Sequence, residues 1–180
     1  MSNGKRIPPI EIRHAQILWP NFEGRKEKFN DEGRRNFCLL IDDETADKLI
    51  EQGWRVKYLK PREEGDSPQP YLKVKVSYMY KPPVVDVIVG NKMSHLNEDT
   101  IYLVDTLDID YCDLVLNGSW NEMPDGNKGY TAYLQEIYIH AAVSRLAKEY
   151  AEEFREDMEN SYADHGQYCN GDCASCPENV

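Results

Sequence analysis

The stretch YLKVKVSYMYK, residues 71–81, decides the fold class because apolar and polar side chains alternate along it. Successive residues of a β-strand point to opposite faces of a sheet. One face therefore carries apolar and aromatic side chains that suit a core: Leu72, Val74, Val76, Tyr78 and Tyr80. The other face carries lysines between an aromatic ring and small or flexible side chains: Tyr71, Lys73, Lys75, Ser77, Met79 and Lys81.

Further strands are predicted on both sides of this stretch. Apolar, β-branched and aromatic runs predict them at 10–19, 34–41, 54–60, 84–89, 107–120 and 130–141. An Asp N-cap in the pair Asp42-Asp43 and Gly53 as a stop bound one short helix at 44–52. The turn sequence PDGNKG at 124–129 precedes the last strand. Many short strands with one short internal helix predict a mainly β protein, a small barrel or sandwich.

The apolar period changes near residue 142, and we expect a boundary there. Residues 1–141 are predicted to form the β domain. Residues 142–180 are predicted to form an acidic C-terminal helix, with Val143, Leu146, Tyr150 and Phe154 at helical spacing, and then a cysteine-containing tail. A chain of 180 residues has room for one domain and such a tail.

The net charge of -11 hides a strong asymmetry. Residues 1–81 hold 16 Lys and Arg against 13 Asp and Glu, a net of +3, whereas residues 82–180 hold 5 against 19, a net of -14. The first half can therefore present a basic face although the whole chain is acidic. No apolar run approaches the roughly 20 residues of a membrane span, and the N-terminus lacks the apolar core of a secretory signal, so we expect a cytoplasmic protein without a membrane partner.

Three segments combine basic and aromatic residues in the basic part of the chain. Lys and Arg can follow a phosphate backbone while bases stack on rings, at about 1–3 kcal/mol for each base. A solvated strand face with rings packed for structural reasons is the alternative interpretation of each segment. The candidate DNA-binding residues are Arg34, Arg35, Phe37, Trp54, Arg55, Lys57, Tyr58, Lys60, Tyr71, Lys73 and Lys75.

The tail holds a second candidate site. His165, Cys169, Cys173 and Cys176 supply an imidazole and three thiolates, which could bind Zn in a tetrahedral site. The alternative is a tail with free thiols, because the first cysteine spacing is longer than in most zinc sites. We expect that no other cofactor is required.

An enzymatic interpretation has less support. The chain lacks a Gly-rich phosphate loop and a Gly-x-Ser-x-Gly elbow, and we expect a protein that is not an enzyme. The acidic run Asp105, Asp108, Asp110 and Asp113 could hold Mg²⁺ in a metal-dependent nuclease, but a solvated strand face explains it as well.

Four strings in order resemble a phage-encoded family of single-stranded-DNA-binding proteins with an OB fold. They are GRRNFCLLID at 33–42, GWRVKYLKPREE at 53–64, PQPYLKVKVSY at 68–78 and GYTAYLQEIYI at 129–139. The resemblance implies an OB-type five-stranded barrel with added strands. It also implies sequence-tolerant binding of single strands in a basic, aromatic groove, during phage replication or recombination in the host cytoplasm.

By the same resemblance, Arg34, Arg35 and Phe37 match the family's arginine–aromatic strand. Trp54, Lys57, Tyr58 and Lys60 match a second string, and Tyr71, Lys73 and Lys75 match the tyrosine-led strand. The cysteine cluster departs from the family pattern.

Two further expectations concern partners. The acidic tail could fold over the basic groove and recruit replication or recombination proteins once DNA displaces it; a homodimer is left open. The rival function is an acidic protein-interaction module, a DNA mimic or inhibitor that acts on a host nucleic-acid enzyme.

Overall fold

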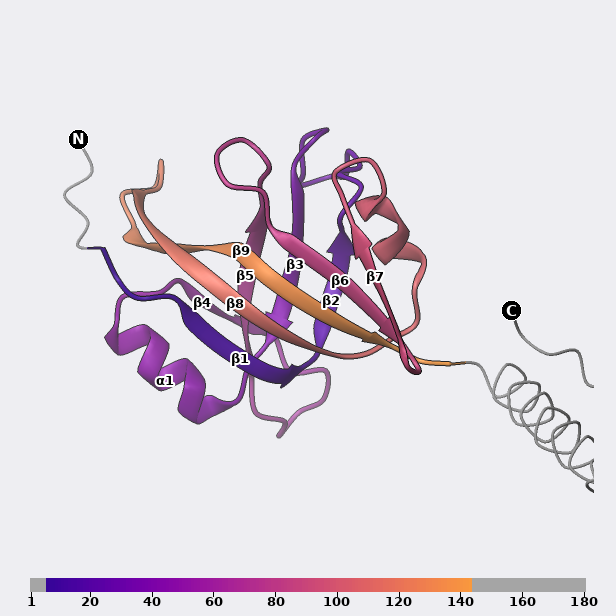
Figure 1. The fold of residues 1–180 in the computed structure, drawn as a ribbon. Helices are drawn as coiled ribbons and strands as arrows, with labels where there is room; N and C mark the ends of the chain where they lie inside the picture. Colours follow the sequence, from indigo (N-terminus) through magenta and orange to yellow (C-terminus); the bar gives the residue numbers. More distant parts are fainter. Residues whose placement is uncertain (1–5, 144–180) are drawn as a thin grey trace, which may run out of the picture. The chain divides into compact units, whose positions relative to one another are not determined.

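Nine strands form one hydrogen-bonded sheet in the computed structural model, which describes residues 6–143 (Figure 1). The strands are β1 (Ile10–Ala15), β2 (Ile17–Asn21), β3 (Arg35–Leu40), β4 (Val56–Leu59), β5 (Gln69–Val76), β6 (Val84–Val89), β7 (Lys92–Leu96), β8 (Ile109–Glu122) and β9 (Lys128–Ala141). The described helices are α1 (Asp43–Glu51) and the 3₁₀ helix η1 (Ile101–Thr106), and neither is long and apolar enough to cross a membrane.

The sheet curls until its two ends meet. The main path runs β1-β8-β9-β5-β3-β2, so β1 and β2 stand at opposite ends of the strand order. One residue, Gln16, separates these two strands in the sequence, and their ends must therefore lie together in space. The bend also requires unusual backbone, since His14 and Trp19 have φ of 52° and 49°, where side chains are disfavoured. The predicted single strand at 10–19 is in fact this bent pair.

The pairing has the OB-type arrangement that the resemblance implied. The bent first strand pairs antiparallel with the second, β3, and with the fourth, β8. The third strand, β5, pairs antiparallel with β3 and parallel with the fifth, β9, where Val74 lies beside Ala132. Inserted segments add α1 and β4 before the third strand, and β6, β7 and η1 after it.

The strand β9 changes neighbours at a bulge. Val115 of β8 pairs with Glu136, but the next residue, Leu116, pairs with Leu134, which leaves Gln135 as the extra residue. Before the bulge β9 lies beside β5, and after it β9 lies parallel to β6, with Val84 opposite Glu136. Leu134 and Ile137 lie three residues apart, and both are buried because the extra residue at the bulge shifts the inward and outward alternation of side chains by one position.

The core confirms the alternation predicted for the central stretch. Leu72, Val74 and Val76 are at most 6% exposed and pack with Phe37 and Leu39 of β3. Each fully buried side chain of this size contributes about 1.5–3 kcal/mol through the loss of apolar surface from water. The predicted strand ends early, however: β5 stops at Val76, and residues 77–83 form a loop. Tyr80, expected in the core, is 93% exposed.

The helix α1 (43–51) lies one residue earlier than the predicted 44–52 and has the predicted Asp cap and the Gly after its end. Asp42 is the N-cap, and its Oδ1 accepts a hydrogen bond of 2.7 Å from the backbone N–H of Thr45. This bond lowers the pKa of the Asp42 carboxyl. Gly53 follows the helix with φ of 88°, a conformation in which a side chain would be strained.

Other boundaries shift by a few residues, and two elements were not predicted. The strands β6, β8 and β9 agree with the predictions at 84–89, 107–120 and 130–141, whereas β4 is shorter than 54–60. The strand β7 and the helix η1 lie in a region for which the sequence predicted no element. The chain divides into compact units at Met1–Ala142 and Val143–Val180, and the predicted acidic helix lies outside the described residues.

Candidate nucleic-acid interface

The outward face of β3 and β5 carries basic and polar side chains in register. Asn36 lies opposite Lys75, and Cys38 lies opposite Lys73. On the far side of Lys75, the parallel pairing with β9 places Tyr133 next to it. Their strand neighbours Phe37, Leu39, Leu72 and Val74 point into the core, so the same alternation that builds the core aligns the polar row.

A groove with a volume of about 630 Å³ lies over this row. The loop between β2 and β3 forms one wall, and the loop after β5 forms another. The lining residues are Phe29, Asn30, Gly33, Arg34, Arg35, Asn36, Lys73, Lys75, Val76, Ser77, Tyr78, Met79, Glu98 and Tyr133. A second hollow of about 380 Å³ shares Ser77, Met79 and Tyr133 with it and extends toward β8. The two hollows together make a continuous path across the sheet.

The loop wall is held by side-chain amides and one carboxylate. Asn21 is buried, and its Oδ1 accepts hydrogen bonds from the N–H groups of Gly24 at 3.0 Å and Arg25 at 2.8 Å. Asp105 of η1 accepts two more, both of 2.9 Å, from the N–H groups of Phe22 and Glu23. These bonds fix the base of a loop that presents Phe29 with 87% of its surface exposed.

The groove is electropositive. Four of its lining residues are Arg or Lys, and two of these form ion pairs, Arg34 with Asp31 at 3.0 Å and Arg35 with Glu98 at 3.3 Å. Partial burial of the Lys75 ammonium, together with repulsion from Lys73, Arg34 and Arg55, lowers the pKa of Lys75. An anion bound beside Lys75 would stabilise its charged form, because it would offset this repulsion.

Aromatic rings accompany the cations along the path. The Lys75 Nζ lies 5.9 Å from the centre of the Tyr133 ring. At the other end of the row, Tyr71 meets the ring of Trp19 edge to face at 6.3 Å, and Trp19 is 61% exposed. The loop after β5 adds Tyr80 beside the second hollow. A row that combines cations with exposed or partly exposed rings suits a flexible single strand whose bases are unstacked.

This chain is similar in sequence to a known protein family. The sequence profile of the family described as "Putative phage ssDNA-binding domain" matches residues 1–167. This chain belongs to that family. Among curated proteins, none matches the sequence. A solved structure, the "Single-stranded DNA-binding protein from bacteriophage Enc34, C-terminal truncation", aligns over 76% of this chain and 87% of that chain, with 11% identity and a TM-score of 0.48.

In this phage ssDNA-binding domain, four of the predicted site residues line the groove together. They are Arg34, Arg35, Lys73 and Lys75. Tyr71, Lys57 and Tyr58 lie further along, since β4 pairs with β5 and places Lys57 opposite Tyr71. Lys57 and Lys60 are exposed, and Tyr58 is 49% exposed. Lys57 therefore continues the basic row beyond Tyr71, whereas Tyr58, opposite the buried Pro70, points to the other face of β4.

Two predicted stacking residues belong instead to the core. Phe37 is 0% exposed and stacks on Phe22 with ring centres 5.2 Å apart. Trp54 is 4% exposed and packs against Tyr130. Phe37 alternates with the outward Asn36 and Cys38, so the arginine–aromatic string places its ring on the inner face. Neither ring is accessible to a base in this structure.

Arg55 contacts the β8–β9 turn. Its Nη1 donates to Thr131 Oγ1 at 3.1 Å, and its Nη2 donates to the backbone oxygens of Asn127, at 3.3 Å, and Asn121. The guanidinium therefore joins the chain after α1 to both arms of the hairpin. Gly129 permits this approach, since a Cβ there would lie 2.9 Å from the Arg55 Cγ.

The sequence prediction missed several groove residues. Tyr133 was assigned only to the closing strand, and its proximity to Lys75 depends on a parallel pairing between strands 58 residues apart, which no local pattern reveals. Phe29 and Tyr80 lie in loops, and Trp19 was assigned to a regular strand. The one available signal was the richness in Tyr of the β9 segment.

Two residues of the acidic run at 105–113 form hydrogen bonds to the backbone. Asp105 is occupied by the loop contacts above, and Asp113 Oδ1 accepts a 2.8 Å hydrogen bond from the His14 N–H. Within residues 6–143, no group of three or more His, Cys, Asp or Glu side chains is placed to hold a metal ion. The predicted cluster His165, Cys169, Cys173 and Cys176 lies outside the described residues.

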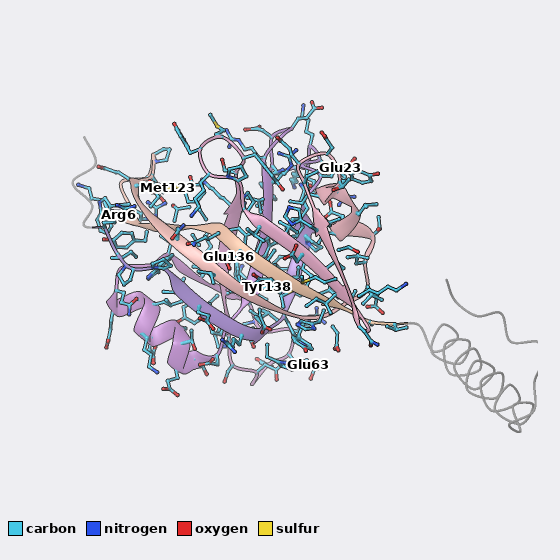
Figure 2. The ribbon with its side chains drawn as sticks, viewed as in Figure 1. Arg6, Glu23, Glu63, Met123, Glu136 and Tyr138 are labelled. Carbon is cyan, nitrogen blue, oxygen red and sulfur yellow. The ribbon has the colours of Figure 1, made fainter. Side chains whose placement is uncertain are left out.

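That second face lies on β9 beyond the bulge. Glu136 and Tyr138 mark it at the centre of Figure 2, with Tyr138 Oη 3.5 Å from Glu136 Oε2. The ring of Tyr111 is sandwiched between His14 and His140, at 4.1 Å on each side. On the neighbouring hairpin, His95 Nδ1 lies 2.8 Å from Asp86 Oδ1. The bulge thus separates an acidic, histidine-bearing face from the basic groove.

Proposed function

We propose that this chain binds single-stranded DNA in the groove over β3, β5 and β9, without strict sequence preference. The observation that carries the proposal is the lining of that groove, where Arg34, Arg35, Lys73 and Lys75 occur together with the ring of Tyr133. In OB folds the face of the second and third strands, with the adjacent loops, is a frequent oligonucleotide surface, and here those strands are β3 and β5. Membership of the phage ssDNA-binding domain family supports the same ligand.

The lining chemistry favours tolerance of sequence. Lys and Arg contact the phosphates that every nucleotide has, and a ring stacks on any base. The path is also bordered by the flexible residues Met79 and Tyr80, which are 83% and 93% exposed and can adapt to bases of different size. We infer a role in phage replication or recombination, in which exposed strands are coated and passed to partner proteins.

The acidic tail supports a partner role. Residues 142–180 hold 3 Lys and Arg against 9 Asp and Glu, a net of -6. Such a segment can compete with DNA for the basic groove and, once displaced, contact basic surfaces of replication or recombination proteins. The rival function as a DNA mimic predicts no open basic groove, and the groove of the described residues is the observation against it.

Fluorescence anisotropy with labelled dT oligomers tests the binding proposal. We expect the full-length chain to prefer single strands over a duplex of equal length, with affinity that falls steeply as salt rises because neutralised phosphates release counterions. Preference for duplex, or affinity independent of salt, would contradict the proposal.

A pair of double variants locates the site. Lys73→Ala with Lys75→Ala should weaken dT binding and reduce the slope of log affinity against log salt by about 0.7 for each lost phosphate contact. Lys48→Ala with Lys92→Ala removes the same charge from α1 and β7 and should leave both quantities near wild type. Equal losses in the two double variants would show that net charge, and not the groove, controls binding.

A further inference from the structure

Glu98 is the one acidic residue among the described residues that line the groove. Its carboxylate lies in a site that otherwise attracts anions, which calls for a physical explanation. It follows β7 in the turn that leads to η1, and its side chain is 55% exposed. A single exposed carboxylate in a phosphate-binding groove repels the DNA backbone unless a cation pairs with it.

Glu98 forms an ion pair with Arg35. The Nη1 of Arg35 lies 3.3 Å from Glu98 Oε1, and the Arg35 side chain is 22% exposed. The guanidinium carbon also lies 5.3 Å from the centre of the Tyr78 ring. Arg35 is therefore held between a ring and a carboxylate at the rim of the groove.

The local turn does not depend on the Glu98 side chain. Asn97 Oδ1 accepts hydrogen bonds from the N–H groups of Asp99, at 3.0 Å, and Thr100, at 3.1 Å. The N–H of Asn97 in turn donates to Thr100 Oγ1 at 2.9 Å. The turn thus presents the carboxylate to Arg35 while leaving it free to move away.

Arg35 has donor capacity that Glu98 does not use. Its Nε is buried without a hydrogen-bond partner among the described residues, as is the hydroxyl of Tyr78 beside it. Burial raises the pKa of Tyr78, with a small opposing effect of Arg35 and a further increase from Glu98, so this hydroxyl stays protonated as a donor. Glu98 accepts one hydrogen bond from Arg35. A phosphate can instead accept two parallel hydrogen bonds from an arginine.

We propose that Arg35 is a phosphate-binding residue of the groove and that Glu98 holds its place in the free protein. A backbone phosphate of single-stranded DNA displaces the carboxylate, so that Arg35 exchanges one anionic partner for another. This inference rests on the proposed function, because it names how one cation of the same groove is used. Two consequences follow. Glu98 lowers the affinity for DNA, and the Arg35–phosphate contact does not add to the slope of log affinity against log salt while Glu98 is present.

Neutralising Glu98 tests the exchange. Glu98→Gln should tighten dT binding about threefold to fivefold, the scale of one exposed ion pair, and steepen the salt slope by about 0.7. Asp99→Asn is the matched control, since it removes an equal charge from the adjacent position of the same turn. Its effect on both quantities should be clearly smaller. Equal effects of the two variants would overturn the proposal in favour of general charge.

A double-mutant cycle gives the second readout. In an Arg35→Gln background the gain from Glu98→Gln should disappear, because no guanidinium remains to be released; a gain that persists would overturn the proposal. Thermal unfolding identifies whether Arg35→Gln folds, and if it does not, the salt slope of Glu98→Gln decides. Wild-type binding with no gain in Glu98→Gln rejects this inference alone, whereas absence of wild-type binding to dT rejects the proposed function as well.

Discussion

Lys75 is the residue whose ionisation should report on DNA binding. Its pKa is lowered by partial burial and by the cations around it, so a bound phosphate should raise that pKa again. Binding then takes up a proton, and affinity should fall as pH rises through the window below the ordinary lysine value of about 10.4. In anisotropy titrations between pH 7 and pH 10, the DNA affinity of Lys75→Arg should fall less than that of wild type, since a guanidinium does not titrate there.

The control for this pH profile is Lys92→Arg on β7. The other groove lysine, Lys73, is present in all three proteins, so the difference between wild type and Lys75→Arg isolates one ammonium. If Lys75→Arg and wild type lost affinity in parallel, the proximity of Lys75 to a bound phosphate would be refuted.

The burial of Phe37 and the half-exposure of Tyr133 predict opposite phenotypes. Tyr133→Ala should weaken dT binding by about 1–3 kcal/mol, the value of one stacked base, with little change in stability. Phe37→Ala should instead lower the free energy of unfolding by about 3–5 kcal/mol because it empties a packed core position. Urea unfolding combined with anisotropy separates the two; a loss of affinity in folded Phe37→Ala equal to that of Tyr133→Ala would argue for direct contact by Phe37.

Among elements, those fixed by local rules were predictable and those fixed by pairing were not. The Asp42 cap and Gly53 bound α1 because capping acts within one turn of chain. The strand β5 was predictable because its alternation is long and regular. The strand β7 is mostly exposed, with four of its five residues at the surface, so no amphipathic pattern marks it. The bend at Gln16 arises from closure of the sheet, which residues 10–19 alone do not encode.

The β8–β9 hairpin depends on Arg55 across the sequence. Its guanidinium donates to one side chain and two backbone oxygens of the hairpin, and hydrogen bonds from charged groups are worth about 1.5–3 kcal/mol. Arg55→Met should therefore lower the free energy of unfolding by about 2–4 kcal/mol. Its effect on dT affinity should be smaller than that of Lys75→Ala.

Thermal unfolding and anisotropy on the same preparations check this assignment, with Lys128→Met as a control within the same hairpin. Wild-type stability together with a large loss of affinity would return Arg55 to the set of direct DNA contacts that the sequence suggested.

For the whole molecule, the sequence predicted which residue types would be used but not how they are distributed over the surface. The basic half of the chain does supply the groove, through Arg34, Lys73 and Lys75. Two other lining residues come from the acidic half, however: Tyr133 from β9, the fifth strand of the OB arrangement, and Glu98 from the turn after β7. The histidines His14, His95 and His140 are isolated in the sequence, and the sheet brings their strands to the two sides of β9, with β1 next to β8 and β7 next to β6.

The distribution of charge over the whole chain makes the acidic tail testable. Residues 1–141 hold 18 Lys and Arg against 23 Asp and Glu, so a chain ending at Val143 has a net charge of -5 instead of -11. If the tail competes for the groove, this truncation should tighten dT binding at low salt. The gain should vanish toward 1 M salt, where the screening length falls to about 3 Å.

A full-length variant with Gln or Asn at the acidic positions 149, 152, 153, 156, 157 and 159 separates charge from length. It should reproduce the gain of the truncated chain at low salt, because the competing feature is the carboxylates. Equal affinity of wild type and both variants at low salt would exclude competition by the tail. The groove would then be open in the full-length protein, and Glu98 would remain as the intramolecular anion that DNA has to displace.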